Sequence, residues 1–169
     1  MVTDLLALKT QEIVVGLGEL FVTCGTSTVI SCIGLGSCVA LCMFDSVTRI
    51  GGMAHIVLPR FDGITTETPA KYANTAVPSL LAEILKCGGN KSNLIVKIAG
   101  GAQLTLAPGI NNTFKTGERN VQEVMLALQK AGLPLSAADI GGAKGRTMRL
   151  YMDTGKVTVR SIGGPDREL

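Results

Sequence analysis

Two short apolar runs, Val39–Phe44 and Met53–Leu58, constrain the fold of this chain more than any other stretch. Each run has the length of a β-strand, and the polar segment Asp45–Arg49 between them has the composition of a turn. The runs therefore predict a β-hairpin, in which the start of the first strand lies near the end of the second. Cys38 lies at that end of the first strand, and His55 lies within the second.

A cysteine and a histidine brought together in this way can form a thiolate–imidazolium nucleophile. A structural interpretation of Cys38 and His55 is also open, because free cysteines and lone histidines are often buried core residues. The local conformation of Cys38 has two alternatives as well. Gly34 and Gly36 predict a tight turn before a strand, whereas Ser37 is a good helix N-cap. A helix starting there would favour the thiolate of Cys38.

The rest of the chain combines strand-like runs with two segments of helical periodicity. Apolar residues from Ala76 to Leu85 recur on one helical face, with Asn74 as the expected N-cap and Gly88-Gly89 as the stop signal. The capping box Asn120–Glu123 is expected to open a second helix. Further strands are expected at residues 13–16, 19–23, 28–33, 94–99, 136–140, 147–152 and 156–162. The pattern predicts an α+β fold, a single-domain layered sandwich of β-sheets with two main helices covering a face.

Length and composition limit the class of protein. The 169 residues, of which 46% are hydrophobic, suffice for one domain with a substantial core. We expect residues 1–169 to form that domain, with residues 1–10 and 163–169 peripheral or disordered. No apolar run approaches the roughly 18 residues of a transmembrane helix, so the protein is not expected to be membrane-embedded. A net charge of +3, scattered along the chain with few aromatic residues, gives no support for a nucleic-acid partner.

The five cysteines fit neither a disulfide framework nor a zinc site. Their number is odd, no two are spaced as C-x-x-C, and the one histidine has no cluster of carboxylates around it. Free thiols, together with Asp4 where an export signal carries basic residues, favour a cytoplasmic location. Neither a metal nor a cofactor is expected.

Glycine-rich and polar motifs recur in order from roughly Val14 to Val159. They are Leu35–Ala40, Phe44-Asp45, Gly51–Pro59, Lys71–Ala73, Gly100–Ala102, Gly117–Asn120, Asp139–Gly142 and Gly145-Arg146. Together they resemble the signature of the CheD family, the chemoreceptor glutamine deamidases of chemotaxis. The resemblance implies a layered α/β sandwich and deamidation of glutamine side chains on methyl-accepting chemotaxis receptors. It also implies binding to a CheC-type phosphatase.

The same resemblance implies roles for individual residues. Cys38 matches the nucleophile of the family and His55 its base. The third catalytic position, a threonine six residues before the nucleophile, falls on Cys32, which is a departure because a thiol is a weaker hydrogen-bond partner than a hydroxyl. Backbone amides in the turn at Gly36 and Ser37 are the expected donors to an oxyanion.

The implied reaction is hydrolysis of the amide through a cysteine thioester. Two alternatives stay open. One is a related cysteine hydrolase acting on another amide, such as a transglutaminase-like enzyme. The other is a catalytically weak regulatory module that docks to a CheC-type phosphatase or to a receptor, which the cysteine at position 32 makes more credible.

Overall fold

The computed structural model describes residues 9–103 and 115–169, and in these residues ten strands form two five-stranded sheets. The strands are short, and several are rich in β-branched residues, which suit a pleated, half-buried surface. They are β1 (Gln11–Val14), β2 (Leu20–Thr23), β3 (Thr28–Leu35), β4 (Val39–Asp45), β5 (Gly51–Ile56), β6 (Leu94–Gly100), β7 (Ala137–Ile140), β8 (Arg146–Tyr151), β9 (Lys156–Ser161) and β10 (Asp166–Glu168).

The first sheet has the order β1-β3-β8-β9-β10 and the second the order β2-β5-β4-β6-β7. The pairs β1–β3 and β6–β7 are parallel, and the other neighbours are antiparallel. The expected hairpin is confirmed as β4 and β5, in which Ala40 lies opposite His55 and Val39 opposite Ile56. Every residue of β4 is buried, because this strand lies at the centre of its sheet.

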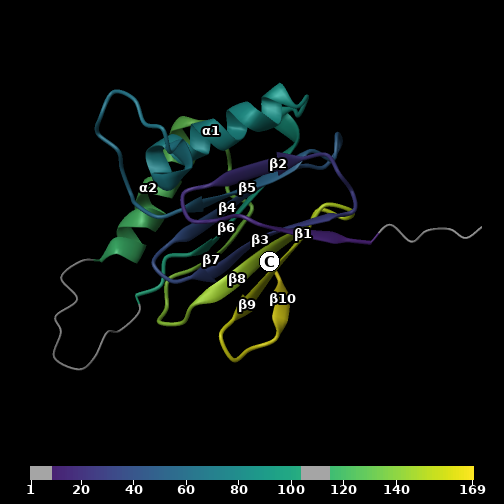
Figure 1. The fold of residues 1–169 in the computed structure, drawn as a ribbon. Helices are drawn as coiled ribbons and strands as arrows, with labels where there is room; N and C mark the ends of the chain where they lie inside the picture. Colours follow the sequence, from purple (N-terminus) through teal and green to yellow (C-terminus); the bar gives the residue numbers. More distant parts are fainter. Residues whose placement is uncertain (1–8, 104–114) are drawn as a thin grey trace, which may run out of the picture.

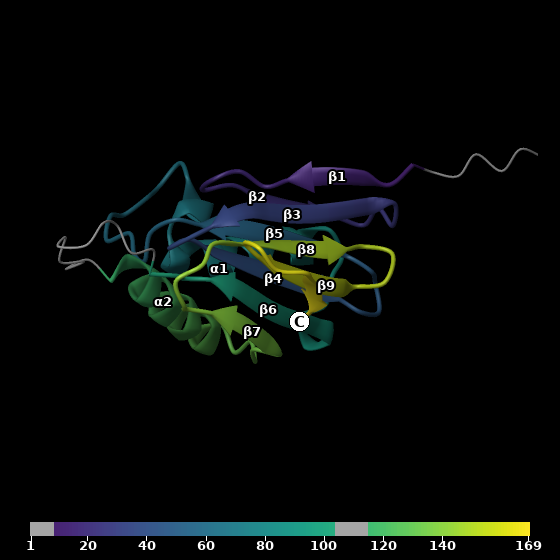
Figure 2. The same ribbon diagram turned by 90° about the horizontal axis from the view of Figure 1, so that it is seen from below.

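Two helices, α1 (Ala73–Lys86) and α2 (Thr116–Lys130), cover the outer face of the second sheet (Figure 1). The strands of the two sheets run in similar directions, as the view from below shows (Figure 2). One apolar cluster joins the helices to the second sheet and includes Val39 and Leu80. Another fills the space between the sheets and includes Ala40 and Met148. The predicted α+β sandwich is therefore confirmed.

Both helices begin earlier than the sequence predicts. Helix α1 begins at Ala73, so Asn74 is not its N-cap. The Asn74 amide instead accepts a hydrogen bond from the N–H of Phe61 and donates one to its carbonyl, both at 2.9 Å. Helix α2 begins at Thr116, so the capping-box prediction for Asn120–Glu123 is wrong, and these residues lie inside the helix. The side chains of Asn74 and Asn120, which the sequence pattern predicts as helix caps, instead form hydrogen bonds to other segments of the chain.

The chain ends differ in what the structure describes. Residues 1–8 of the segment expected to be peripheral, residues 1–10, lie outside the described residues. For residues 163–169 the structure gives an edge strand rather than disorder, because β10 pairs with β9, with Asp166 opposite Arg160. Among the described residues, neither helix is long and apolar enough to cross a lipid bilayer.

Candidate active site

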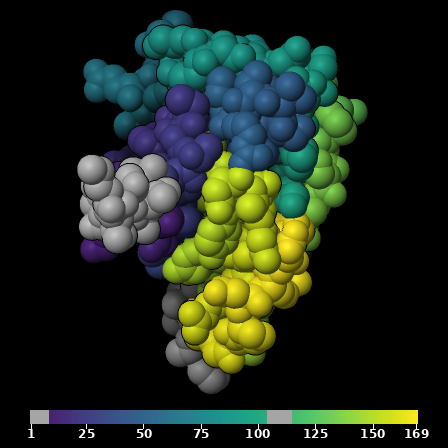
Figure 3. All heavy atoms as spheres, turned by 90° about the vertical axis from the view of Figure 1, so that its right-hand side faces the viewer, coloured from purple at the N-terminus to yellow at the C-terminus, as the bar shows by residue number. Residues whose placement is uncertain are grey.

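The β4–β5 hairpin brings Cys38 and His55 to one face of the second sheet. Ala40 lies opposite His55, and the same register extended by two residues sets Cys38 opposite Val57. The backbone ladder itself ends at Val39 and Ile56, and a continued register makes Cys38 and His55 diagonal neighbours on one face of the hairpin. Their face is the one turned toward the first sheet, because Ala40 belongs to the cluster between the sheets. Figure 3 shows the end of the molecule with the blue β4–β5 turn, and Cys38 precedes β4 at the other end of this hairpin.

His55 is oriented by a backbone carbonyl of the opposite sheet. Its Nδ1 lies 3.1 Å from the carbonyl oxygen of Val15, which follows β1. A carbonyl accepts only, so Nδ1 carries the proton and the neutral ring keeps a free lone pair on Nε2. Nε2 is buried without a hydrogen-bond partner among the described residues. Burial lowers the pKa of His55 below 6.5, although the bond to Val15 opposes this, so the ring is neutral near pH 7.

Cys38 lies between β3 and β4 and is half-buried. The helical alternative is wrong, because no helix begins at this residue. The expected lowering of its pKa is also wrong: burial raises the pKa of the Cys38 thiol, and the N–H of Cys38 itself opposes this only partly. In the resting protein Cys38 therefore carries a neutral thiol and His55 a neutral imidazole. Such a thiol has to be deprotonated by a base as it attacks.

A glycine pair at the end of β6, Gly100 and Gly101, supports the backbone of Cys38. The N–H of Gly101 donates to the Cys38 carbonyl, and the N–H of Ala102 donates to the Gly36 carbonyl, both at 2.8 Å. Gly100 has a φ of +124° and lies so close that a Cβ there would be 2.1 Å from the carbonyl oxygen of Cys38. Only glycine allows this approach, so Gly100 determines how closely β6 and its loop support the cysteine.

A side chain of α2 also contacts this segment. The Nδ2 of Asn120 donates to the carbonyl of Ser37 at 2.8 Å and to the carbonyl of Val57 at 2.9 Å. Asn120 is fully buried. Sequence analysis missed this contact, because the pattern around Asn120 is also that of a capping box.

Cys32 lies in the apolar layer between the sheets. It is fully buried on β3, in the same cluster as Cys42. Burial, with Cys42 and Cys38 nearby, raises the pKa of its thiol far above the ordinary range. Burial also raises the pKa of Cys42, to about 12. Since the carbonyl of Val15 binds the Nδ1 of His55, the Cys32 thiol is not needed to fix the tautomer of the ring.

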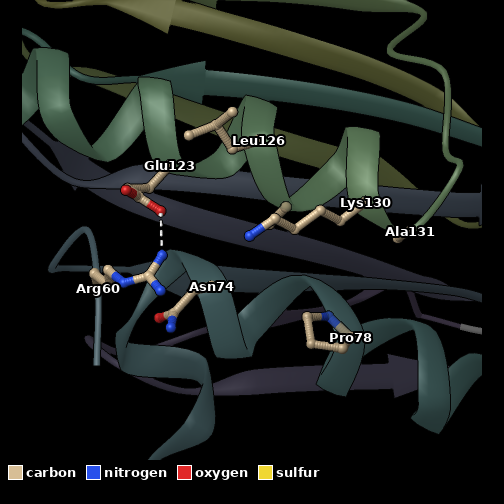
Figure 4. A pocket seen from close by; sticks show the side chains of 8 residues that line it. Arg60, Asn74, Pro78, Glu123, Leu126, Lys130 and Ala131 are labelled. Carbon is tan, nitrogen blue, oxygen red and sulfur yellow. Dashed lines mark ion pairs between the residues drawn. The ribbon is translucent and has the colours of Figure 1, made fainter. Parts of the chain in front are cut away.

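A separate hollow of about 350 Å³ lies between α1 and α2 (Figure 4). Arg60 and Glu123 face each other across it, with Nη1 and Oε2 3.5 Å apart. None of the site residues predicted from the sequence lines it. The hollow is therefore distinct from the Cys38–His55 pair.

Comparison with known proteins assigns the family. A sequence model of CheD, described as chemotactic sensory transduction, matches residues 57–161. A protein of Desulfitobacterium hafniense named probable chemoreceptor glutamine deamidase CheD is 45% identical over 129 residues, 76% of this chain and 81% of that protein. The chain belongs to the CheD family. The chemoreceptor glutamine deamidase CheD of Thermotoga maritima is 42% identical over 154 residues, 91% of this chain and 94% of that protein. A CheD of Symbiobacterium thermophilum is 43% identical over 157 residues, 92% of this chain and 95% of that protein.

Two features of this CheD site could not be found from the sequence. The acceptor at Val15 is a backbone carbonyl, and any residue type supplies one. Asn120 is a motif residue in the resemblance to CheD, but its contact with Ser37 and Val57 depends on how α2 packs. Cys38 and His55 could be proposed from the sequence, because the hairpin that carries them is local in sequence.

Proposed function

We propose that this CheD-family chain hydrolyses glutamine side chains of methyl-accepting chemotaxis receptors to glutamate and ammonia. The observation that carries the proposal is the diagonal relation of Cys38 and His55 in a chain whose relatives are named chemoreceptor glutamine deamidases. Cys38 is the nucleophile and His55 the base.

The first half of the reaction forms a thioester. The Nε2 of His55 takes the thiol proton of Cys38 while the sulfur attacks the side-chain carbonyl carbon of the glutamine. A carboxamide is a poor electrophile with a poor leaving group, so the imidazolium returns the proton to the amide nitrogen as the C–N bond breaks. Ammonia leaves, and the former amide carbonyl is bonded to sulfur.

The second half releases glutamate. Neutral His55 takes a proton from a water molecule, whose oxygen attacks the thioester carbonyl. The C–S bond breaks, and the imidazolium returns the proton to the sulfur of Cys38. Each cycle consumes one water and converts a neutral amide into a carboxylate. No metal or cofactor takes part in this scheme.

Backbone amides in the segment from Gly36 to Cys38 are the proposed oxyanion donors. The N–H of Cys38 favours the thiolate of the same residue, and the tetrahedral oxygen has to form beside that sulfur. Ser37 and Gly36 belong to the same turn, whose carbonyls are bound by Asn120 and Ala102. Binding of these carbonyls limits rotation of the peptide planes that carry the donors.

Mass spectrometry of a receptor cytoplasmic fragment tests the proposal. The wild-type protein should convert particular glutamines to glutamate and release one ammonia for each, and Cys38→Ala should abolish both. Cys42→Ala is the matched control, because it removes a buried thiol four residues further along the chain, within β4. Equal conversion by wild type and Cys38→Ala would refute the assignment of the nucleophile.

A second candidate is a regulatory module that docks to a CheC-type phosphatase or to a receptor without efficient catalysis. The observation in its favour is Cys32, at the position where the resemblance to CheD implies threonine. The two candidates differ in turnover: a module binds its partner equally well as wild type or Cys38→Ala and releases no ammonia. Adding a primary amine to the assay separates hydrolysis from a transglutaminase-like reaction, because the latter leaves the amine attached to the substrate.

We also infer that the protein acts in the cytoplasm. The proposed mechanism needs a reduced thiol at Cys38, and the five cysteines are all free in the structure. The reducing cytoplasm keeps thiols in this state. Oxidation that consumes the Cys38 thiol should accordingly abolish deamidation, and a reductant should restore it.

A further inference from the structure

We propose that Asn120 is a positioning residue, which aligns Cys38 with His55 by joining the carbonyl of Ser37 to the carbonyl of Val57. The inference rests on the proposed function, because it assumes that the two residues act as a pair. Ser37 directly precedes Cys38, and Val57 comes two residues after His55.

The backbone pairing of β4 with β5 ends just before the site. Its last pair is Val39 with Ile56, and the next positions in register are those of Cys38 and Val57. There the N–H of Val57 donates to Lys71 and the carbonyl of Cys38 accepts from Gly101, so these groups bind other segments. Beyond the end of this ladder, the side-chain amide of Asn120 bridges the two segments, with one N–H donated to the Ser37 carbonyl and one to the Val57 carbonyl.

Helix α2 is held firmly enough for this role. A Cβ at Gly117 would lie 2.6 Å from the carbonyl oxygens of Gly101 and Ala102, so the first turn of the helix packs directly against the loop that supports Cys38. A Cβ at Gly101 would lie 2.4 Å from Val121 of the same helix. Asn120 therefore approaches the hairpin from an element with little freedom to shift.

The position of Asn120 within α2 argues against a local role. Asparagine is a poor residue for a helix interior, because its side chain competes for backbone groups. Here the amide is fully buried and both N–H groups point away from its own helix, to two other segments. If Asn120 only filled space, an apolar side chain could replace it without loss. An apolar side chain here would leave the Ser37 and Val57 carbonyls without this donor.

The test compares Asn120→Ala with Val124→Ala. Val124 lies one turn further along α2, is fully buried and packs in the apolar cluster, so its truncation destabilises the helix without touching the site. For each protein we would measure thermal unfolding, kcat and KM for receptor deamidation, and the rate of Cys38 alkylation by iodoacetamide as a function of pH. In the wild type this profile should contain an inflection due to His55, which His55→Gln removes.

Asn120→Ala should lower kcat at least tenfold, leave KM within twofold, and remove the His55 inflection. Val124→Ala should keep kcat and the inflection even where it unfolds at the lower temperature. Wild-type kcat and profile in Asn120→Ala, or equal losses in Val124→Ala, would overturn the proposal. If Asn120→Ala does not fold, Asn120→Ser, which retains one shorter donor, is measured in the same way and decides.

The alkylation profile separates this inference from the proposed function. If the wild type deamidates no receptor but its inflection disappears only in the Asn120 variant, the activity is wrong and the positioning role stands. If the wild-type profile has no inflection, the positioning role is wrong, because there is then no Cys38–His55 pair for Asn120 to align.

Discussion

Replacing Gly100 with alanine tests whether the end of β6 determines the place of the Cys38 carbonyl. The added Cβ would lie 2.1 Å from that oxygen, whereas real Cβ contacts stay above 3.0 Å. The carbonyl therefore has to retreat by about 0.9 Å or the loop has to move away by as much. Either movement weakens the hydrogen bond from the Gly101 N–H to Cys38, which is 2.8 Å long.

The expected loss of stability has two parts. A non-glycine residue at a φ of +124° costs on the order of 1–3 kcal/mol. Loss of the Gly101–Cys38 hydrogen bond costs about 0.5–1.5 kcal/mol more, and the unbound buried carbonyl adds to this. We therefore expect Gly100→Ala to lower the free energy of unfolding by roughly 2–5 kcal/mol. A misplacement of catalytic groups by about 1 Å can lower a rate on the order of a hundredfold, so we expect the deamidation rate of Gly100→Ala to fall by about that factor.

Gly88→Ala is the control, since Gly88 also has a positive φ, +99°, but only one ordinary contact, with Ile50 at 3.9 Å. It reports the conformational cost alone, at a site beyond the end of α1. Urea unfolding and initial deamidation rates are measured for both variants at a temperature where both are folded. If Gly100→Ala loses no more stability than Gly88→Ala and retains its rate, the reasoning from the close approach is refuted.

Three further predictions concern pH and single substitutions. Since burial lowers the pKa of His55 and neutral His55 is the base, the acid limb of kcat should lie below pH 6.5; a limb above that value would contradict the assignment. Burial opposes ionisation of Asp45, but N–H groups of Thr48, Asn90 and Val47 outweigh it and lower its pKa to about 2. This stabilisation is complete above pH 3.8 and is lost as the pH falls through 2, so Asp45→Asn should cost roughly 2 kcal/mol at pH 7 and flatten the acid side of the stability curve, as denaturant titrations from pH 7 to pH 2 can check. Cys32→Thr should change the deamidation rate by less than about twofold, because the Nδ1 proton of His55 is already donated to the Val15 carbonyl and the ring needs no hydroxyl at position 32 to orient it; a tenfold gain would show that residue 32 acts on His55.

The hairpin and the two helical segments could be predicted because their signals are local. The runs of β4 and β5 are separated by five residues of turn composition, and the period-2 geometry of strands then fixes which residues share a face. That geometry places Cys38 and His55 at the same end of the hairpin. The fold class followed from the number and length of such runs rather than from any single residue.

The contacts that complete the site depend on packing between distant segments. Asn120 lies 83 residues from Ser37 in sequence, and its neighbours form a pattern that also describes a helix cap. Asn74 was misread in the same way, because its amide binds Phe61 across a loop instead of capping α1. The pKa of Cys38 was predicted in the wrong direction because the sequence does not reveal how deeply a residue beside a strand is buried.

The carbonyl that orients His55 follows an edge strand. β1 has four residues, three of them exposed, and pairs only with β3 at the edge of the first sheet. Local opening of such an edge has a lower free energy than global unfolding. When β1 detaches, Nδ1 of His55 loses its acceptor and the ring is free to exchange tautomers while the rest of the sandwich remains folded. The lifetime of the competent site is thus governed by the fraying of a peripheral strand, and amide hydrogen exchange at Val15, whose N–H donates to Ser31, reports it directly.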